Sequence, residues 1–267
     1  MRRRLVGRLS DLAMALDPSL ILARAGMPPD AWQARVLRSR PRQLLLNITR
    51  QGGKSVTVAA AALNEALFHP PALVLLLSPS QRQSQELFRV MMQLYGRIGM
   101  TAEPEAESTL RIELPNQSRI VALPGGKEET IRGYSSVSLL VIDEASRVDD
   151  GLYHAVRPML AVSSGRLAAF STPWGQRGWF HEAWMNGEGF ERVRVTAAEC
   201  PRISPEFLEQ ERRTLPDSVF RQEYGCEFMD ISGAIFRGED ITAAFDNDLQ
   251  PLPRPAGLDS ILGGAIQ

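Results

Sequence analysis

Short runs of nearly unbroken apolar residues recur along the chain and predict the buried strands of a sheet. Longer segments with apolar residues at helical spacing separate most of these runs. Strands that are apolar along their whole length, and that alternate with helices, are typical of a parallel sheet covered on both faces. The predicted core strands are 44–48, 72–77, 137–142 and 166–170, with 193–196 as a fifth candidate.

The intervening segments predict the helices and one hairpin. Residues 1–40 are expected to form one or two helices, interrupted at Pro28-Pro29, with Asp30 as the N-cap of the helix that follows. Apolar and polar residues alternate on either side of residues 115–118, which predicts a β-hairpin. The other predicted elements are helices 31–38, 56–68, 81–96 and 152–160, and hairpin strands 109–113 and 119–123.

Apolar run lengths and cysteine content favour a cytosolic protein without a membrane span. No apolar run approaches the ~20 residues that a span needs. The basic N-terminus is not followed by the apolar stretch of a signal peptide. Cys200 and Cys226 lie 26 residues apart without metal-ligand companions, so reduced thiols are expected.

Charge is balanced overall but uneven along the chain. The formal net charge is −1, which gives no argument for a nucleic-acid partner. Residues 1–50 hold ten Arg against three Asp, whereas residues 199–248 hold five Arg against twelve acidic residues. A basic region of this kind contacts a phosphate backbone in some proteins. A solvated helical face is the commoner explanation of a block of charge.

Residues 47–55 have the layout of a phosphate-binding loop, because they join a predicted strand to a predicted helix and end in Gly-Gly-Lys-Ser. Lys54 is one of only two lysines among 30 basic residues. A compact ammonium suits the gap between β- and γ-phosphates better than a planar guanidinium does. Ile48 stands where the general pattern has its first glycine, so the match is partial. The segment predicts binding of a nucleoside triphosphate.

Two further polar groups follow core strands, at the strand ends where parallel sheets bind ligands. Asp143 and Glu144 directly follow the third predicted strand. Adjacent residues there point in different directions, so one carboxylate can hold Mg²⁺ while the other polarises an attacking water. An acidic helix N-cap is the alternative, which the lysine loop upstream disfavours. Ser171-Thr172-Pro173 follows the fourth strand, either as a simple turn or as a sensor of the γ-phosphate.

The run Arg-Gln-Gly-Gly-Lys-Ser at 50–55 resembles the large terminase subunit of tailed phages, the motor that packages DNA into procapsids. The resemblance extends over about residues 28–240. The other matching segments are Trp32-Gln33 (adenine-recognising glutamine motif), Ile131-Arg132-Gly133 (arginine–glycine element), Ser171-Thr172-Pro173 (coupling motif) and 220–228 (segment that closes the ATPase domain).

We therefore expect an α/β fold of the RecA-like P-loop NTPase type, with a mainly parallel sheet flanked by helices. The expected divisions are an N-terminal helical segment 1–40, an ATPase core 41–200, a small C-terminal subdomain 201–235 and a linker or tail 236–267.

The resemblance also implies roles for individual residues. Lys54 would bridge the β- and γ-phosphates, and Ser55 and Asp143 would hold Mg²⁺. Glu144 would orient or deprotonate the attacking water. The implied nucleotide-binding residues are Gln33, Arg50, Gln51, Gly52, Gly53, Lys54 and Ser55.

Two arginines resemble the family's catalytic arginines. Arg50 would touch the γ-phosphate within the same subunit, and Arg132 would be inserted into a neighbouring subunit's site. The alternative for Arg132 is a surface ion pair. Because Arg132 would act across a subunit boundary, ATP hydrolysis is expected to be weak in the monomer and faster in an assembled ring.

The function implied by the resemblance is ATP hydrolysis, dependent on Mg²⁺, coupled to movement along double-stranded DNA in the cytoplasm of a bacterial host. The implied partners are a portal ring, a small terminase subunit and further copies of the chain in a ring, with no membrane. Large terminases also carry a nuclease domain that needs clustered carboxylates for two metals. Only 27 residues follow Asp240, so no nuclease activity is expected. A truncated prophage gene, a split gene and a deliberately shortened chain are equally compatible with this.

Two other functions remain open. A superfamily 2 helicase-like or remodelling ATPase shares the phosphate-loop and acidic motifs, but it needs a second RecA-like domain for which the chain has no room. A prophage remnant would bind nucleotide without motor function, although intact Lys54, Ser55, Asp143 and Glu144 argue against decay of the site.

Overall fold

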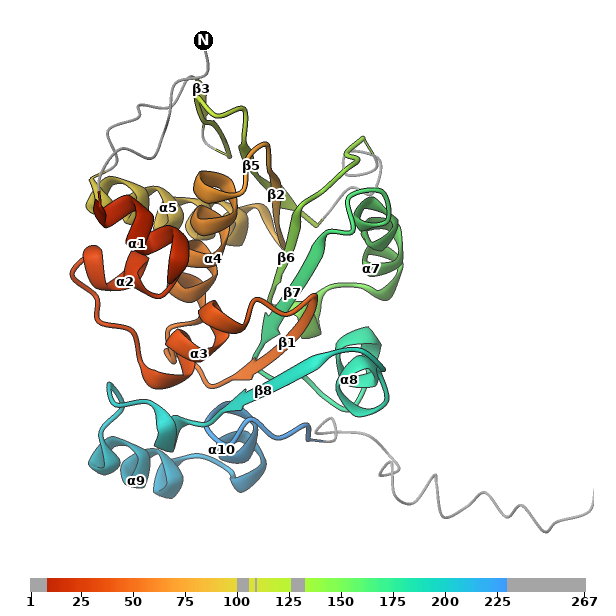
Figure 1. Ribbon diagram of the computed structural model, residues 1–267. Coiled ribbons are helices and arrows are strands. Elements are labelled where there is room, and N and C mark those ends of the chain that lie inside the picture. Colours follow the sequence, from red (N-terminus) through yellow and green to blue (C-terminus); the bar gives the residue numbers. More distant parts are fainter. Residues whose placement is uncertain (1–8, 100–105, 109, 126–132, 230–267) are drawn as a thin grey trace, which may run out of the picture. The chain divides into compact units, whose positions relative to one another are not determined.

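The computed structural model describes residues 9–99, 106–108, 110–125 and 133–229 of the chain (Figure 1). The chain divides into two units, Met1–Met229 and Asp230–Gln267. All described residues belong to the first unit, so the predicted tail lies outside them.

An eight-stranded sheet forms the centre of the first unit, in the order β3-β4-β5-β2-β6-β7-β1-β8. Every pairing from β5 through to β8 is parallel, and the two pairings of the hairpin edge are antiparallel. The strands are β1 (Gln43–Ile48), β2 (Leu73–Ser78), β3 (Ala106–Ser108), β4 (Arg111–Glu113), β5 (Arg119–Pro124), β6 (Leu139–Asp143), β7 (Arg166–Ser171) and β8 (Glu191–Val195). The predicted α/β class, the parallel core strands and the hairpin are confirmed.

Helices cover both faces of this sheet, as the unbroken apolar strands predict (Figure 1). The first five helices pack on one face, and α7 and α8 pack on the other (Figure 1). The helices are α1 (Leu9–Leu16), α2 (Leu20–Arg24), α3 (Ala31–Ser39), α4 (Lys54–Phe68), α5 (Gln81–Ile98), α7 (Asp150–Val156), α8 (Gly178–Met185), α9 (Pro205–Thr214) and α10 (Asp217–Glu223).

Alternate residues of one strand contribute to different cores. Leu44 and Leu46 of β1 pack with the helices of one face, whereas Leu45 between them packs with those of the other face. This two-residue period follows from the pleat of a strand. It explains why a strand buried on both sides is apolar at every position.

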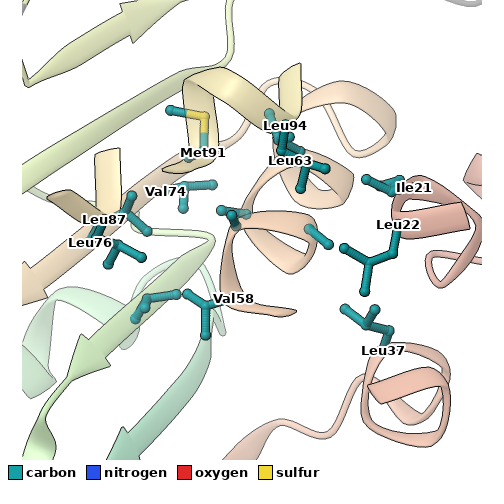
Figure 2. Packing of buried hydrophobic residues seen from close by; sticks show 14 of the residues in the cluster. Ile21, Leu22, Leu37, Val58, Leu63, Val74, Leu76, Leu87, Met91 and Leu94 are labelled. Carbon is teal, nitrogen blue, oxygen red and sulfur yellow. The ribbon is translucent and has the colours of Figure 1, made fainter. Parts of the chain in front are cut away.

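Helix α4 lies at the centre of the larger core (Figure 2). Figure 2 shows Val58 and Leu63 of α4 surrounded by side chains of α2, α5 and β2. The alanines of its first three turns are almost all fully buried, and their small side chains let neighbouring elements approach closely. This packing fixes the position of the helix, and with it the position of Lys54 at its first residue.

The predicted helix 152–160 is interrupted. It is the α-helix α7 followed by a 3-10 turn, Arg157–Leu160. Pro158 explains the change, because proline lacks the N–H that an α-helix requires and its ring clashes with the preceding turn. Helices α8, α9 and α10 were not predicted individually. No residue of α9 or α10 is buried, and few of their residues are apolar, so their sequences offer few apolar positions from which to predict a helix.

The sheet brings three of the predicted motifs to one edge. Strands β6, β7 and β1 are neighbours and run parallel, so their carboxyl ends lie together. Asp143 pairs with Phe170, and Asn47 pairs with Ser171. The phosphate-loop segment, the acidic pair and Ser171 therefore meet where parallel sheets bind their ligands.

Candidate nucleotide site

The loop between β1 and α4 has backbone angles that need glycine. Gly53, the residue before α4, has φ 93°, in the left-handed region. At Gly52 the limit is space, since a Cβ there would lie 2.8 Å from Cγ1 of Ile48. The Gly-Gly pair thus lets the chain turn sharply from strand to helix, which leaves the amides of the first helical turn free to bind an anion.

Lys54 forms an ion pair with Glu144, which joins the loop to the end of β6. Both side chains are largely buried, with 14% and 19% of their surface exposed. Glu144 has φ 48°, an unusual backbone conformation for a residue other than glycine. Strained backbone of this kind concentrates at functional sites. The structure therefore brings together the two side chains to which the sequence assigns phosphate binding and water activation.

Asp143 is buried beside this pair. Burial raises the pKa of its carboxyl group from 3.8 to about 6, the positive charge of Lys54 lowers it, and the negative charge of Glu144 raises it. One oxygen accepts a hydrogen bond of 2.9 Å from the backbone N–H of Glu144. A buried carboxylate with this little compensation is a good partner for a cation.

The predicted magnesium ligands fit the chemistry of the ion. Asp143 and Ser55 offer a carboxylate and a hydroxyl oxygen, and Mg²⁺ prefers oxygen ligands, usually one or two from protein together with phosphates. Within the described residues no group of three or more His, Cys, Asp or Glu side chains suits a metal ion.

Ser171 and Thr172 are linked to the chain that follows the acidic pair. The Ser146 hydroxyl lies 2.6 Å from that of Ser171 and donates to the carbonyl of Thr172 at 2.8 Å. The backbone N–H of Ser146 also donates to the Ser171 hydroxyl at 3.2 Å. Because Glu144 is two residues before Ser146, these hydrogen bonds join the end of β6 to the end of β7. Pro173 follows directly, and no motif in the sequence points to the part that Ser146 plays.

The described contacts of Arg50 lead toward helix α10. The Arg50 side chain is 64% exposed and forms an ion pair of 2.6 Å with Glu223 of α10. The neighbouring Thr49 donates its hydroxyl hydrogen to the backbone carbonyl of Glu223 at 3.0 Å. The phosphate loop is thus joined to the helices that end the described chain. Arg132, the second predicted catalytic arginine, lies outside the described residues.

Gln33 lies beneath the phosphate loop and is buried, with 2% of its surface exposed. Its amide nitrogen donates to the hydroxyl of Thr57 at 2.8 Å and to the carbonyl of Gly53 at 3.4 Å. Its amide oxygen accepts from the backbone N–H of Asp30 at 2.8 Å, and Asp30 is the N-cap residue of α3, as predicted. Arg202 contacts the loop as well, since it donates to the Gly52 carbonyl at 2.8 Å. Arg202 and Thr57 were missed in the sequence because neither belongs to a recognisable motif.

Several arginines of the basic N-terminal region have partners inside the molecule. Arg38 pairs with Asp17 at 2.7 Å and Arg40 pairs with Glu65 at 2.8 Å. Arg24 donates to the backbone carbonyl of Ile98 at 2.8 Å. These three arginines therefore serve the fold. Among the described helices, none has the length and apolar character to cross a membrane.

Comparisons with known proteins agree with this geometry. A profile of the family described as "Terminase large subunit, T4likevirus-type, N-terminal" matches residues 45–243. Among curated proteins, the large terminase subunit of Thermus phage G20c is 26% identical, across 81% of this chain and 52% of its own length. The chain thus spans about half the length of this curated relative.

Solved structures show the same fold. The large terminase ATPase domain of Thermus phage P74-26 superposes with a TM-score of 0.68 at 22% identity, covering 78% of this chain and 97% of that domain. A large terminase from a thermophilic bacteriophage, solved in complex with ADP, superposes with a TM-score of 0.63 at 10% identity, covering 76% of this chain and 54% of its own. The predicted RecA-like fold is confirmed by these superpositions.

Proposed function

The chain belongs to the terminase large-subunit family, and we propose that it is an ATP-hydrolysing motor domain that couples hydrolysis to translocation of double-stranded DNA during phage packaging. The observation that carries this proposal is the convergence of Lys54, Asp143 and Glu144 at one edge of the parallel sheet. The thermophilic phage terminase that was solved with ADP supports a nucleotide as the ligand. Within the chain, we propose residues 41–200 as the ATPase core and 201–235 as its subdomain.

The Lys54–Glu144 ion pair supports a sequence of events. Phosphate groups entering the loop would compete for the Lys54 ammonium, because they carry more negative charge than one carboxylate. Glu144 would then be free to accept a proton from a water that attacks the γ-phosphorus, and ADP would leave. The ion pair would thus keep the base occupied until nucleotide is present.

Mg²⁺ would be held by Ser55 and Asp143, and when bound it would neutralise negative charge that develops on the phosphates. Coordination needs ionised Asp143, and a bound cation would oppose the rise in pKa that burial causes in this group. Arg50 would have to leave Glu223 in order to reach a γ-phosphate. Gln33 as an adenine contact and Arg132 as an arginine that acts in a neighbouring subunit also remain proposals.

The coupling of hydrolysis to DNA movement would pass through Ser171, Thr172 and Pro173. The Ser146 hydrogen bonds support this, since they join the catalytic strand end to the coupling segment. The proposed partners are double-stranded DNA, a portal ring, a small terminase subunit and other copies of this chain in a ring, within the host cytoplasm.

The test is ATP turnover by the purified chain, with and without long duplex DNA, beside the Glu144→Ala variant. The proposal predicts turnover that requires Mg²⁺, rises with DNA and with protein concentration, and is abolished by the substitution. Strand separation on a forked duplex would instead indicate a helicase. ATP binding without any turnover in the assembled state would indicate a remnant that has lost its motor function.

A further inference from the structure

Two consecutive carbonyl groups of the phosphate loop accept hydrogen bonds from side chains, two of which, Arg202 and Gln33, come from other segments of the chain. The Gly52 carbonyl accepts from Arg202 at 2.8 Å. The Gly53 carbonyl accepts from the Thr57 hydroxyl at 2.9 Å and from Gln33 at 3.4 Å. A Cβ on Gly53 would lie 2.8 Å from Nη2 of Arg202 and 2.9 Å from Nε2 of Gln33, so the two side chains pack closely against the loop.

These contacts fix the direction in which the loop amides point. In a planar trans peptide, the carbonyl of one residue and the N–H of the next point in opposite directions. Holding the Gly52 and Gly53 carbonyls therefore directs the N–H groups of Gly53 and Lys54 away from Arg202 and Gln33. Those amides are among the groups expected to cradle a phosphate. An anion site whose donors are already oriented binds more tightly, because less ordering is needed on binding.

Arg202 is itself held in place by Asp30. Its guanidinium donates to one carboxylate oxygen of Asp30 at 3.0 Å and lies 2.7 Å from the other. The first contact is a charge-assisted hydrogen bond and the second is an ion pair, and together they hold the guanidinium against Asp30. With its charge balanced by Asp30, Arg202 is suited to hold the loop rather than to act as a free cation.

Gln33 is committed to the same network. Its amide nitrogen is used by Thr57 and Gly53, and its oxygen by the Asp30 N–H. With 2% of its surface exposed, it would have to break these bonds in order to read a nucleobase. The side chains of Gln33 and Arg202 donate hydrogen bonds to backbone carbonyls of the loop. Any nucleotide would contact this loop through its phosphates, whatever its base.

We propose that Arg202, oriented by Asp30, is a positioning residue that holds the phosphate loop in its anion-binding conformation and so contributes to triphosphate affinity whatever the base. This inference rests on the proposed nucleotide-binding function and deepens it. It links that site to the segment preceding α9, some 150 residues away in sequence. A direct contact between Arg202 and the nucleobase is the competing explanation, and it predicts a different pattern of ligand dependence.

The experiment measures binding of ATP, GTP and inorganic triphosphate by calorimetry for the unaltered chain, Arg202→Ala and Arg202→Lys. Arg213→Ala is the matched control, because Arg213 is an exposed arginine of α9, the helix that follows this segment. We expect Arg202→Ala to weaken all three ligands by about 10-fold, as the loss of one charge-assisted hydrogen bond at a partly exposed site would do. Arg202→Lys should recover only part of the affinity, since lysine cannot make the paired contact with Asp30.

A second readout separates positioning from loss of fold. Amide hydrogen exchange at Gly53 and Lys54 in the nucleotide-free chain should accelerate in Arg202→Ala, while amides in the buried strands β2 and β6 stay protected. Loss of ATP binding with GTP and triphosphate unaffected would overturn the proposal in favour of a nucleobase contact. Unchanged binding of all three ligands would also overturn it. If the unaltered chain binds none of them, the proposed function fails and this inference fails with it.

Discussion

Helix α4 carries a cluster of charged side chains near each of its ends, and the two clusters differ in how completely their charged groups are hydrogen-bonded. At its first residue, Lys54 meets Glu144 beside buried Asp143. Eleven residues further along, Glu65 meets Arg40 and Arg166. Both clusters join segments that are far apart in sequence, and both are largely shielded from water.

The charged groups of the cluster around Glu65 all have hydrogen-bond partners within the protein. Glu65 accepts from Arg40 at 2.8 Å and from Arg166 at 3.1 Å. The guanidinium groups have further partners, with Arg40 donating to Asn64 at 3.1 Å and Arg166 to the Pro41 carbonyl at 3.2 Å. Burial lowers the pKa of Arg166, but an arginine side chain remains charged in a protein. The hydrogen bonds to Glu65 and Pro41 hold the charged guanidinium in position.

In the cluster around Lys54, the largely buried carboxylates lack enough partners to balance their negative charge. Two carboxylates face one ammonium, and burial raises the pKa of Asp143 to about 6. An uncompensated buried carboxylate destabilises a fold unless it later gains a cation or a proton. Pairing of charges alone therefore does not mark function. The remaining capacity for a ligand distinguishes the candidate site from a structural ion cluster.

The strongest test of this comparison removes the proposed base from one cluster. Glu144→Gln keeps the size of the side chain but cannot accept a proton, so we expect kcat for ATP to fall by about 10²–10⁴-fold. Nucleotide binding should persist, as measured by calorimetry. Glu86→Gln, which alters a surface pair with Arg89, is the control and should leave kcat unchanged. Normal ATP turnover in Glu144→Gln would mean that the Lys54 cluster is no more catalytic than the Glu65 cluster.

The next test removes the central acid of the structural cluster. Glu65→Ala leaves two arginines without their shared carboxylate, and we expect a loss of about 3 kcal/mol in the free energy of unfolding. Urea denaturation measures the loss, and turnover per folded molecule should stay the same. A fall in kcat with unchanged stability would mean that this cluster serves catalysis.

The third test compares two aspartates whose pKa values are shifted in opposite directions. The folded chain binds a proton at Asp143 more tightly than the unfolded chain does, so this group lowers stability as pH rises from about 4 to about 6. Asp143→Asn removes the penalty and should stabilise the nucleotide-free chain above pH 6 by at most about 3 kcal/mol, with little effect near pH 4. Thermal unfolding across this pH range measures the difference.

Asp17 supplies the opposite case. Hydrogen bonding to Arg38 lowers the pKa of this carboxyl group to about 2. Its stabilising contribution is therefore present above pH 4 and is lost as pH falls through 2. Asp17→Asn should destabilise the chain at neutral pH. Stability changes with the same sign in both variants would contradict the assignment of Asp143 as an uncompensated group.

The smallest effect is expected from the neutral hydrogen bonds beside the site. Ser146→Ala removes the hydroxyl that joins Ser171 and Thr172, which should cost about 1 kcal/mol of stability. Basal ATP turnover should survive while its stimulation by DNA falls. Ser163→Ala is the control, because its hydroxyl donates to the Val137 carbonyl at 2.5 Å, at the other end of the sheet. Equal DNA stimulation in the two variants would argue against a coupling role.

Much of the fold could be predicted because its strands are buried on both faces. Unbroken apolar runs such as Leu73–Leu77 and Leu139–Ile142 are difficult to place anywhere other than in a buried strand. The helices that follow the last core strand were harder to predict. Helix α9 buries none of its residues and has only two large apolar side chains, Phe207 and Leu208, so its Ser204 N-cap and Pro205 are the main signs of where it begins.

Local sequence was sufficient for the phosphate-loop layout and the acidic pair, because each depends on neighbouring residues along one strand end. Tertiary packing was needed to show that Arg50 faces Glu223, that Ser146 joins two strand ends, and that Arg202 and Gln33 hold the loop carbonyls. The contacts of Ser146, Arg202 and Arg50 join segments that lie 25 to about 170 residues apart in sequence. Gln33 differs, because its motif suggests a side chain open to ligand and the fold buries it. A side chain of Arg or Gln can bond any carbonyl within reach. Which carbonyl it reaches is set by the packing of helices on the sheet, and no local pattern encodes that choice.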